Sequence, residues 1–331
     1  MDIAPVEDLA ALQAFHSVEV ATHDADFVAL PADQLEELVP LLDGKPRAGE
    51  LTRMHVATDA GTAVGTVSIS LPQLDNLTSA NVSVGVHPER RRRGIGRTLW
   101  DFALEEVRRA GRRRVFVEAH WGPGETDGPA FSLLRGAGAR QVLDDYRRLL
   151  DLAQHPVGEV HPVADGYRVV QWVDVAPDQV VEGCAYLSGR MTLDAPMGEM
   201  DYEQEKWDAA RYRAKEQAAM ERKRTRVASA VVHEATGQVA GITDIGVQRG
   251  RSQIAFQWDT IVDPDHRGHR LGMVLKTWNH RYLVEQVPGV THINTWNAAS
   301  NTFMVAVNDA LGFEIAERWS EWQLDLRDEG S

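Results

Sequence analysis

The sequence predicts an α+β protein of two tandem domains, each with a mixed, mostly antiparallel sheet flanked by helices. Three observations predict this class. The chain has 331 residues, more than one domain usually holds. A strand–loop–helix segment occurs twice, and a hairpin pattern precedes each copy. Each half is long enough to bury a core of its own.

The repeated segment has the same order in both halves. A β-branched strand ends at Pro88 or Pro264, and a basic, glycine-bearing loop and a helical pattern follow. Each proline stands eight residues before the last glycine of its loop, Gly96 or Gly272, and the two copies lie 176 residues apart. We therefore interpret the chain as a duplication.

The elements around the two copies agree in order. In the first half we expect a hairpin over 53–71, a helix over 98–110, a strand at 115–117 and a short helix over 130–135. In the second half we expect a strand over 167–175, a charged helix over 200–224, a hairpin over 227–247, a helix over 273–287, a strand over 291–296 and a helix over 301–311. The charged helix predicts a solvated face that could also cover a substrate cleft.

Proline and glycine mark a linker at 153–166, so the predicted domains are residues 1–152 and 167–331. The net charge of −14 argues against a general nucleic-acid binder and suits a cationic substrate as well as plain solubility. No stretch of 18 apolar residues predicts a membrane span, and the N-terminus does not have a signal-peptide pattern, so we expect a cytoplasmic protein. The single cysteine, Cys184, excludes an intrachain disulfide and a cysteine metal cluster; we expect it to be a packing residue, and we expect no metal.

The loop between strand and helix predicts an anion site, because unpaired N–H groups and the helix dipole meet there. Neither copy has the Gly-Lys-Ser/Thr of a Walker loop, and Leu99 replaces the third glycine of a dinucleotide fingerprint. Residues 91–96 instead match Arg/Gln-x-x-Gly-x-Gly/Ala at Arg91, Gly94 and Gly96, and the chain resembles the GNAT acyltransferases in this motif. In the second copy Arg270 replaces the first glycine; we expect it to take a helical conformation and to add a cation.

The resemblance implies acetyl-CoA, or another acyl-CoA, as co-substrate. Asn301 resembles the residue that contacts the pantetheine arm, and Asn308 stands where the family often has a tyrosine acid. The residues that the resemblance assigns to this ligand are Val86, Arg91, Arg93, Gly94 and Gly96 in the first half, and Val262, Arg267, Gly268, His269, Arg270, Gly272, Asn301 and Asn308 in the second.

The resemblance also implies direct attack of an amine on the thioester. A bulge in the strand at 253–262 would free an N–H for the oxyanion, with Ile261 and Val262 facing the thioester. Asp259 is the first candidate base and Asp244 the second. A plain surface carboxylate or a hairpin salt bridge is an equal alternative for Asp259. Water would protonate the leaving thiolate.

Trp258 and Trp296 pack in the core or line a pocket for an organic cation. The sequence thus favours an N-acetyltransferase that acts on the primary amine of a small molecule, with catalysis in the second half and a degenerate or structural first half. A non-catalytic CoA-binding sensor or scaffold is the alternative, because neither half has the tyrosine. A protein or peptide N-acetyltransferase is another. Monomer and homodimer both fit the sequence.

Overall fold

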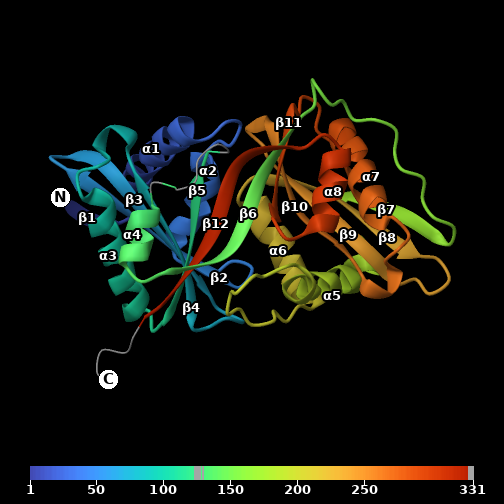
Figure 1. Cartoon of the computed structure of the whole chain (residues 1–331), viewed down its shortest axis with the longest axis horizontal. Coiled ribbons are helices and arrows are strands. Elements are labelled where there is room, and N and C mark those ends of the chain that lie inside the picture. Colours follow the sequence, from blue (N-terminus) through green and yellow to red (C-terminus); the bar gives the residue numbers. More distant parts are fainter. Residues whose placement is uncertain (123–127, 129, 327–331) are drawn as a thin grey trace. The chain divides into compact units, whose positions relative to one another are not determined.

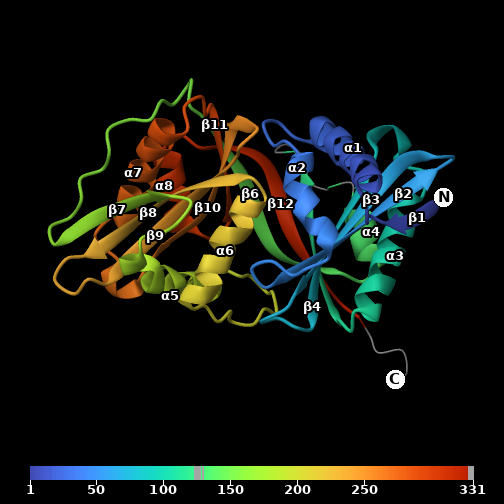
Figure 2. The ribbon, with the colours of Figure 1, turned by 180° about the vertical axis from the view of Figure 1, so that it is seen from behind.

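The computed structural model describes residues 1–122, 128 and 130–326, which form two compact units (Figure 1; Figure 2 gives the view from behind). The first unit comprises Met1–Asp144, Gly198–Asp201 and Glu317–Ser331, and the second comprises Asp145–Met197 and Tyr202–Ala316. In each unit helices flank a mixed sheet, which confirms the predicted α+β class. No described helix is both long and apolar enough to cross a membrane.

The sheet of the first unit has the strand order β1-β2-β3-β4-β5-β12. Only the β4–β5 pair is parallel. Its elements are β1 (Asp2–Pro5), α1 (Leu9–Asp26), α2 (Leu35–Leu38), β2 (Glu50–Asp59), β3 (Thr62–Pro72), β4 (Ser79–Val86), α3 (Ile95–Arg109), β5 (Arg114–Trp121), α4 (Phe131–Gly136) and most of β12 (Glu314–Asp325).

The sheet of the second unit has the order β6-β11-β10-β9-β8-β7, and only its β10–β11 pair is parallel. Its elements are β6 (Arg140–Asp151, from Asp145 onward), β7 (Tyr167–Val173), α5 (Asp178–Asp194), α6 (Ala209–Glu221), β8 (Arg224–His233), β9 (Val239–Gln248), β10 (Arg251–Val262), α7 (Leu271–Gln286), β11 (His292–Ala298) and α8 (Thr302–Ala310).

Alternation along the strands places helices on both faces of each sheet. In β8, Ala228 and Ala230 share a buried cluster with Cys184 of α5, whereas Val231 shares one with Leu275 of α7. Because successive side chains of a strand point to opposite faces, α5 and α7 cover opposite sides of this sheet. The second unit therefore has an α5/α6 face and an α7 face.

Most predicted elements are confirmed, including both hairpins and the helices that follow the loops. The charged helix was predicted too long, because α6 spans only Ala209–Glu221. Asp208 begins it with an extended backbone and a side chain that accepts a hydrogen bond from the N–H of Arg211 at 2.8 Å. This helix also buries Tyr212 and Glu216, so its face is only partly solvated.

The duplication extends to single contacts. The N–H of His87 donates to the carbonyl of Val64 at 3.0 Å, and the N–H of Asp263 donates to the carbonyl of Ala240 at 2.9 Å. A Cβ on Gly65 would meet the side chain of Leu99, and a Cβ on Gly241 would meet that of Leu275. All these pairs are 176 positions apart, so the two units repeat the same close approach of strand and helix.

The close approach at Gly241 gives a test of the packing. A Cβ there would lie 2.9 Å from both the carbonyl oxygen of Ile261 and Cδ1 of Leu275. We expect Gly241→Ala to lower the free energy of unfolding by roughly 1–3 kcal/mol in urea denaturation. The control is Gly158→Ala, where a Cβ meets nothing within 4 Å. Equal stability of the two variants would contradict the packing described.

Candidate active site

The loop before α7 presents a row of backbone N–H groups. Gly268 has a φ of +89°, and Arg270, at the start of α7, has a φ of +55°. In the described structure the N–H groups of residues 268–272 have no backbone acceptor, and that of Met273 is bonded to the carbonyl of Arg270. The helical conformation that Arg270 takes is the left-handed one, with a φ of +55° and a ψ of +24°.

The loop before α3 has the same construction. Gly94 begins the helix with a φ of +83°, which is the left-handed conformation that Arg270 takes in the second copy. The N–H groups of residues 92–97 have no backbone acceptor among the described residues. A Cβ on Gly94 or Gly268 would meet nothing within 4 Å, so the space beside each loop is open. Both loops fit a phosphate group.

The motif arginines hold their loops in the same way but differ in how closely a carboxylate pairs with their charge. Nε of Arg91 donates to the carbonyl of Val86 at 3.1 Å, and its two terminal nitrogens pair with Asp26 at 2.7 Å. Nε of Arg267 donates to the carbonyl of Val262 at 3.4 Å. Its other nitrogen lies 3.5 Å from Asp194, at the end of α5. The charge of Arg91 is therefore directly paired, and that of Arg267 is more available to an anion.

Other predicted loop residues lie beside these contacts. The exposed Arg93 donates to the carbonyl of Glu89 at 3.3 Å. The ring of His269 lies 5.3 Å from that of Tyr167, whose hydroxyl is 2.9 Å from Nδ1 of His266. Asn301 begins α8 and accepts a hydrogen bond from the N–H of Met304 at 3.2 Å, so its side chain has a capping role.

Strand β10 is irregular at the predicted position. Its register with β9 shifts between Gln257 and Thr260, so β10 has one extra residue there. Its pairing with β11 ends at the same place, where Gln257 is opposite Thr295. The described β3–β4 register of the first unit has no such shift. A bulge can leave a strand N–H free to bind an oxyanion, and the second unit has it.

The two residues after the bulge point to different layers. Ile261 is buried in the cluster that includes α5 and α6, whereas Val262 packs against the cluster of α7. Their side chains therefore hold the end of β10 between the two helix layers.

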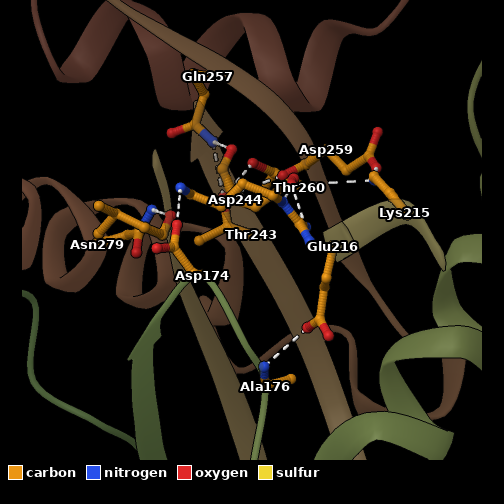
Figure 3. Close-up of polar contacts among 12 residues, drawn as sticks. Asp174, Ala176, Lys215, Glu216, Thr243, Asp244, Gln257, Asp259, Thr260 and Asn279 are labelled. Atoms are coloured by element: carbon orange, nitrogen blue, oxygen red, sulfur yellow. Dashed lines mark hydrogen bonds and ion pairs between the residues drawn. The ribbon is translucent and has the colours of Figure 1, made fainter. Parts of the chain in front are cut away.

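Both predicted acids lie in a charged cluster that was not predicted from the sequence (Figure 3). Nζ of Lys215, on α6, is 2.9 Å from Asp259 Oδ2 and 3.9 Å from Asp244 Oδ2. Arg226, on β8, donates to Asp244 Oδ2 at 2.6 Å. The structure thus brings the two carboxylates together, and each has a cation beside it.

The cluster fixes the charge of Asp244. Burial would raise the pKa of this carboxyl, but Lys215 and Arg226 outweigh burial and lower it. Burial likewise opposes the charge of Lys215, and the carboxylates of Asp259 and Asp244 raise its pKa. Asp244 is therefore a firmly charged group, and a weak base.

Gln257 links strands β10 and β9 to helix α7 at the bulge. Its Nε2 donates to the Thr243 hydroxyl and to the Asp244 carbonyl, both at 2.9 Å. Its Oε1 is 3.2 Å from Nε2 of His280 on α7. Burial and Lys276 lower the pKa of His280 to about 3, so this ring is neutral.

Aromatic rings border the irregular part of β10. Trp258 is 45% exposed and stacks on Trp296 of β11 with ring centroids 6.0 Å apart. The ring of Phe256 also stacks on Trp258, with centroids 5.8 Å apart. The exposed ring face suits an apolar or cationic group.

Cys184 has the expected packing role. It is fully buried on α5, and burial raises the pKa of its thiol to about 12. Its thiolate is thus not accessible as a nucleophile.

Lys276 was not predicted as a site residue. This residue of α7 is 1% exposed, and its Nζ donates to Asn308 Oδ1 at 2.7 Å. Burial lowers its pKa to about 7, and Arg148 adds to the effect. A signal was present, because Gly272, Lys276 and Leu283 share the buried stripe of the helix.

A cavity of about 650 Å³ in the second unit lies elsewhere, along α7, the end of α8 and residues 154–161. None of the predicted site residues lines it. The candidate site is therefore defined by the loop and by the irregular part of β10.

The pKa of Lys276 predicts a pH-dependent stability. From about pH 7 to its ordinary value of 10.5, the lysine is protonated only in the unfolded chain, so wild-type stability rises with pH. Lys276→Met removes a buried amine, so the variant should have a higher free energy of unfolding than the wild type at about pH 7. We expect this advantage to fall by a few kcal/mol, to order of magnitude, as the pH rises over this range. Denaturant unfolding at several pH values measures it. Lys45→Met is the exposed control, and a flat difference for both variants would refute the assignment.

Comparisons with known proteins agree with this geometry. Residues 18–121 match the model of the Acetyltransferase (GNAT) family. A tandem GNAT protein from the clavulanic acid biosynthesis pathway, solved without AcCoA, is 28% identical, with a TM-score of 0.84 and 99% of both chains covered. A GCN5-related N-acetyltransferase from Sphaerobacter thermophilus is 18% identical, with a TM-score of 0.68 and 98% of this chain and 96% of that chain covered, and shows the shared fold. No curated protein matches in sequence. The chain thus contains a segment that matches the GNAT acetyltransferase family and is similar over its whole length to a tandem GNAT protein, which agrees with an acyltransferase.

Proposed function

We propose that the chain transfers an acetyl group from acetyl-CoA to the primary amine of a small molecule, and that the second unit carries the reaction. The observation that carries this proposal is the irregular part of β10. There a bulge, the separation from β11 and Asp259 occur within a few residues of the loop before α7, and Lys215 links Asp259 to Asp244 of β9.

The donor's diphosphate would lie on the loop before α7. The N–H groups of residues 268–272 and the start of the helix supply hydrogen bonds and positive charge. Arg267, Arg270 and His269 surround this place. The thioester arm would then enter between β10 and β11, where their pairing ends. The tandem GNAT neighbour supports acetyl-CoA as the donor, because the description of its structure states that it was solved without AcCoA.

The reaction is attack of the acceptor nitrogen on the thioester carbonyl. Negative charge then develops on the carbonyl oxygen, and an N–H freed at the bulge before Ile261 would stabilise it. The pre-formed donor costs no reorganisation during the reaction, which is how such sites lower the barrier.

The two carboxylates take different roles in this proposal. Asp244 is buried and held in the charged form by Arg226, so we assign it to attract the acceptor's ammonium group. Asp259 lies in the bulge itself and is 30% exposed, so we assign it to take the proton that the ammonium loses. In this proposal the ammonium group of the acceptor displaces Lys215 from its contact with Asp259.

Several features support a small organic amine as acceptor. The protein's net charge of −14 attracts cations, and the exposed face of Trp258 stacked on Trp296 can cover an ammonium-bearing group. The neighbour at 28% identity is named after a small-molecule biosynthesis pathway.

The first unit has an equally built loop but no described bulge in β4. We propose that it binds acetyl-CoA weakly or serves as a scaffold. In this proposal residues 1–152 and 167–331 are the two copies of the duplication, joined by 153–166.

A non-catalytic CoA-binding sensor is the second candidate. The observation that favours it is the side chain of Asn308, fully buried and bonded to Lys276 at the position of the family's tyrosine. A sensor binds CoA without releasing its thiol from acetyl-CoA, and this separates the two functions.

Gly272→Asp tests the loop. Its carboxylate would stand at the start of α7 and repel the diphosphate, whereas a Cβ there meets only Phe303 at an ordinary 3.5 Å. We expect at least about tenfold weaker acetyl-CoA binding by calorimetric titration. Gly272→Asn is the uncharged control of equal size. The pair Gly96→Asp and Gly96→Asn tests acetyl-CoA binding at the loop of the first unit in the same way. Equal affinities of Asp and Asn variants in both units would refute the loop assignment.

Asp259→Asn tests the base. Loss of a positioned base lowers kcat by about 10²- to 10⁴-fold, here measured as thiol release from acetyl-CoA in the presence of a panel of small primary amines. Asp244→Asn, by contrast, should act mainly on the KM for the amine. Full activity of Asp259→Asn would remove Asp259 from the mechanism, and no thiol release by the wild type with any amine would favour the sensor.

A further inference from the structure

A chain of three polar side chains borders the place where β10 and β11 separate. Asn297 of β11 lies two residues beyond Thr295, the last residue in register with β10. Its Oδ1 accepts a hydrogen bond from Nδ2 of Asn308 on α8. Asn308 in turn accepts the hydrogen bond from Nζ of Lys276 on α7. An amine group is thus held inside the protein and is linked through Asn308 to a residue just beyond the point where the strands separate.

The surroundings of this amine do not neutralise its charge. Within the described residues, the contacts of Nζ are Asn308 Oδ1 at 2.7 Å and the ring of Phe313, 5.2 Å from the ring centroid. The charged and titratable groups nearby are Arg148 of β6 and the neutral His280 of α7. Arg148 is itself ion-paired with Asp309 of α8. A lysine buried without a carboxylate is costly, and such groups gather at functional sites.

We propose that Lys276 gives its proton to the thiolate that leaves when the thioester is cleaved, and that Asn308 positions the amine for this transfer. The inference rests on the proposed function and deepens it, because it replaces water as the acid and assigns a residue where the family's tyrosine is missing.

The step balances as follows. The acceptor nitrogen forms a bond to the acyl carbon, the carbon–sulfur bond breaks, and its electron pair goes to sulfur. The thiolate takes a proton from the ammonium of Lys276, which becomes a neutral amine. The acceptor enters as an ammonium group and loses two protons through Asp259 to solvent, one before the attack and one after it, and solvent returns one proton to Lys276. The products are an amide, a thiol and one proton.

The acidity of the group suits the transfer. The pKa of Lys276 is lowered to about 7, whereas an ordinary thiol has a pKa of about 8.5 and an ordinary tyrosine about 10. Proton transfer from Lys276 to the thiolate is therefore downhill, and transfer from an ordinary tyrosine would be uphill. Near neutral pH the lysine is also partly protonated, so it can act and recover.

The test uses CoA itself as the probe, with its thiol bound at the site. The ultraviolet absorbance of the thiolate is titrated from about pH 6 to 10 in the presence of excess wild-type protein, Lys276→Met or Asn308→Asp. A nearby ammonium stabilises the thiolate, so at about pH 7 and below, where Lys276 is protonated, the wild type should hold a several-fold larger thiolate fraction than Lys276→Met.

Asn308→Asp is the second variant, for the case that Lys276→Met does not fold stably, because aspartate has the same shape as asparagine. Its carboxylate would pair with Lys276 and cancel the ammonium's effect, so at about pH 7 and below the thiolate fraction should again be several-fold smaller than in the wild type. Lys45→Met is the exposed control and should match the wild type. CoA bound in the first unit does not affect the difference between variants.

The outcomes separate the inference from the function on which it rests. If CoA binds with equal affinity to all three proteins and its thiol titrates alike in each, Lys276 does not act on the sulfur and the inference fails alone. If CoA does not bind to the wild type, the proposed function fails and the inference with it.

Discussion

The candidate site depends on one constraint, the point at which β10 stops pairing regularly with its neighbours. Up to Gln257 this strand is in register with β11, and after it the strand bulges against β9 and continues without β11. Gln257 holds the transition through Thr243, the Asp244 carbonyl and His280. The bulge, the end of the pairing with β11 and the loop before α7 thus follow one another along β10, and Asp259 lies within this stretch.

The duplication separates what the fold requires from what the chemistry requires. Strand and helix approach through a glycine at Gly65 and again at Gly241, and the motif arginine bonds to the last strand carbonyl in both copies. These contacts maintain the loop, and they are kept in both units. The bulge occurs in β10 but not in the described β4 register. The copies thus share the construction of the loop and differ in the bulge, which in the proposed function stabilises the oxyanion.

The sequence predicted the fold where the signal was local. Hairpin turns, helix stops and the basic glycine loop are encoded by neighbouring residues, and these predictions are confirmed. The start of α6 was misjudged because charged residues continue the helical pattern beyond the Asp208 cap. The hand of the Arg270 conformation was not foreseen, because a non-glycine residue rarely takes a positive φ. Contacts over long sequence distances, such as that of Lys215 with Asp259 across 44 positions, were not predictable, since packing decides which charges meet.

Two lysines of the second unit show how the surroundings, rather than the residue type, set the chemistry. Burial opposes the charge on both. Around Lys215 the carboxylates of Asp259 and Asp244 outweigh burial, and they raise its pKa. Beside the neutral amide of Asn308 nothing opposes burial, and the pKa of Lys276 falls to about 7. The α5/α6 face therefore keeps its charges fixed near neutral pH, while the α7 face has an amine whose charge can change. The proposed acyl transfer, in which a charge is held at the acceptor and a proton moves at the leaving group, would use this division between the two faces.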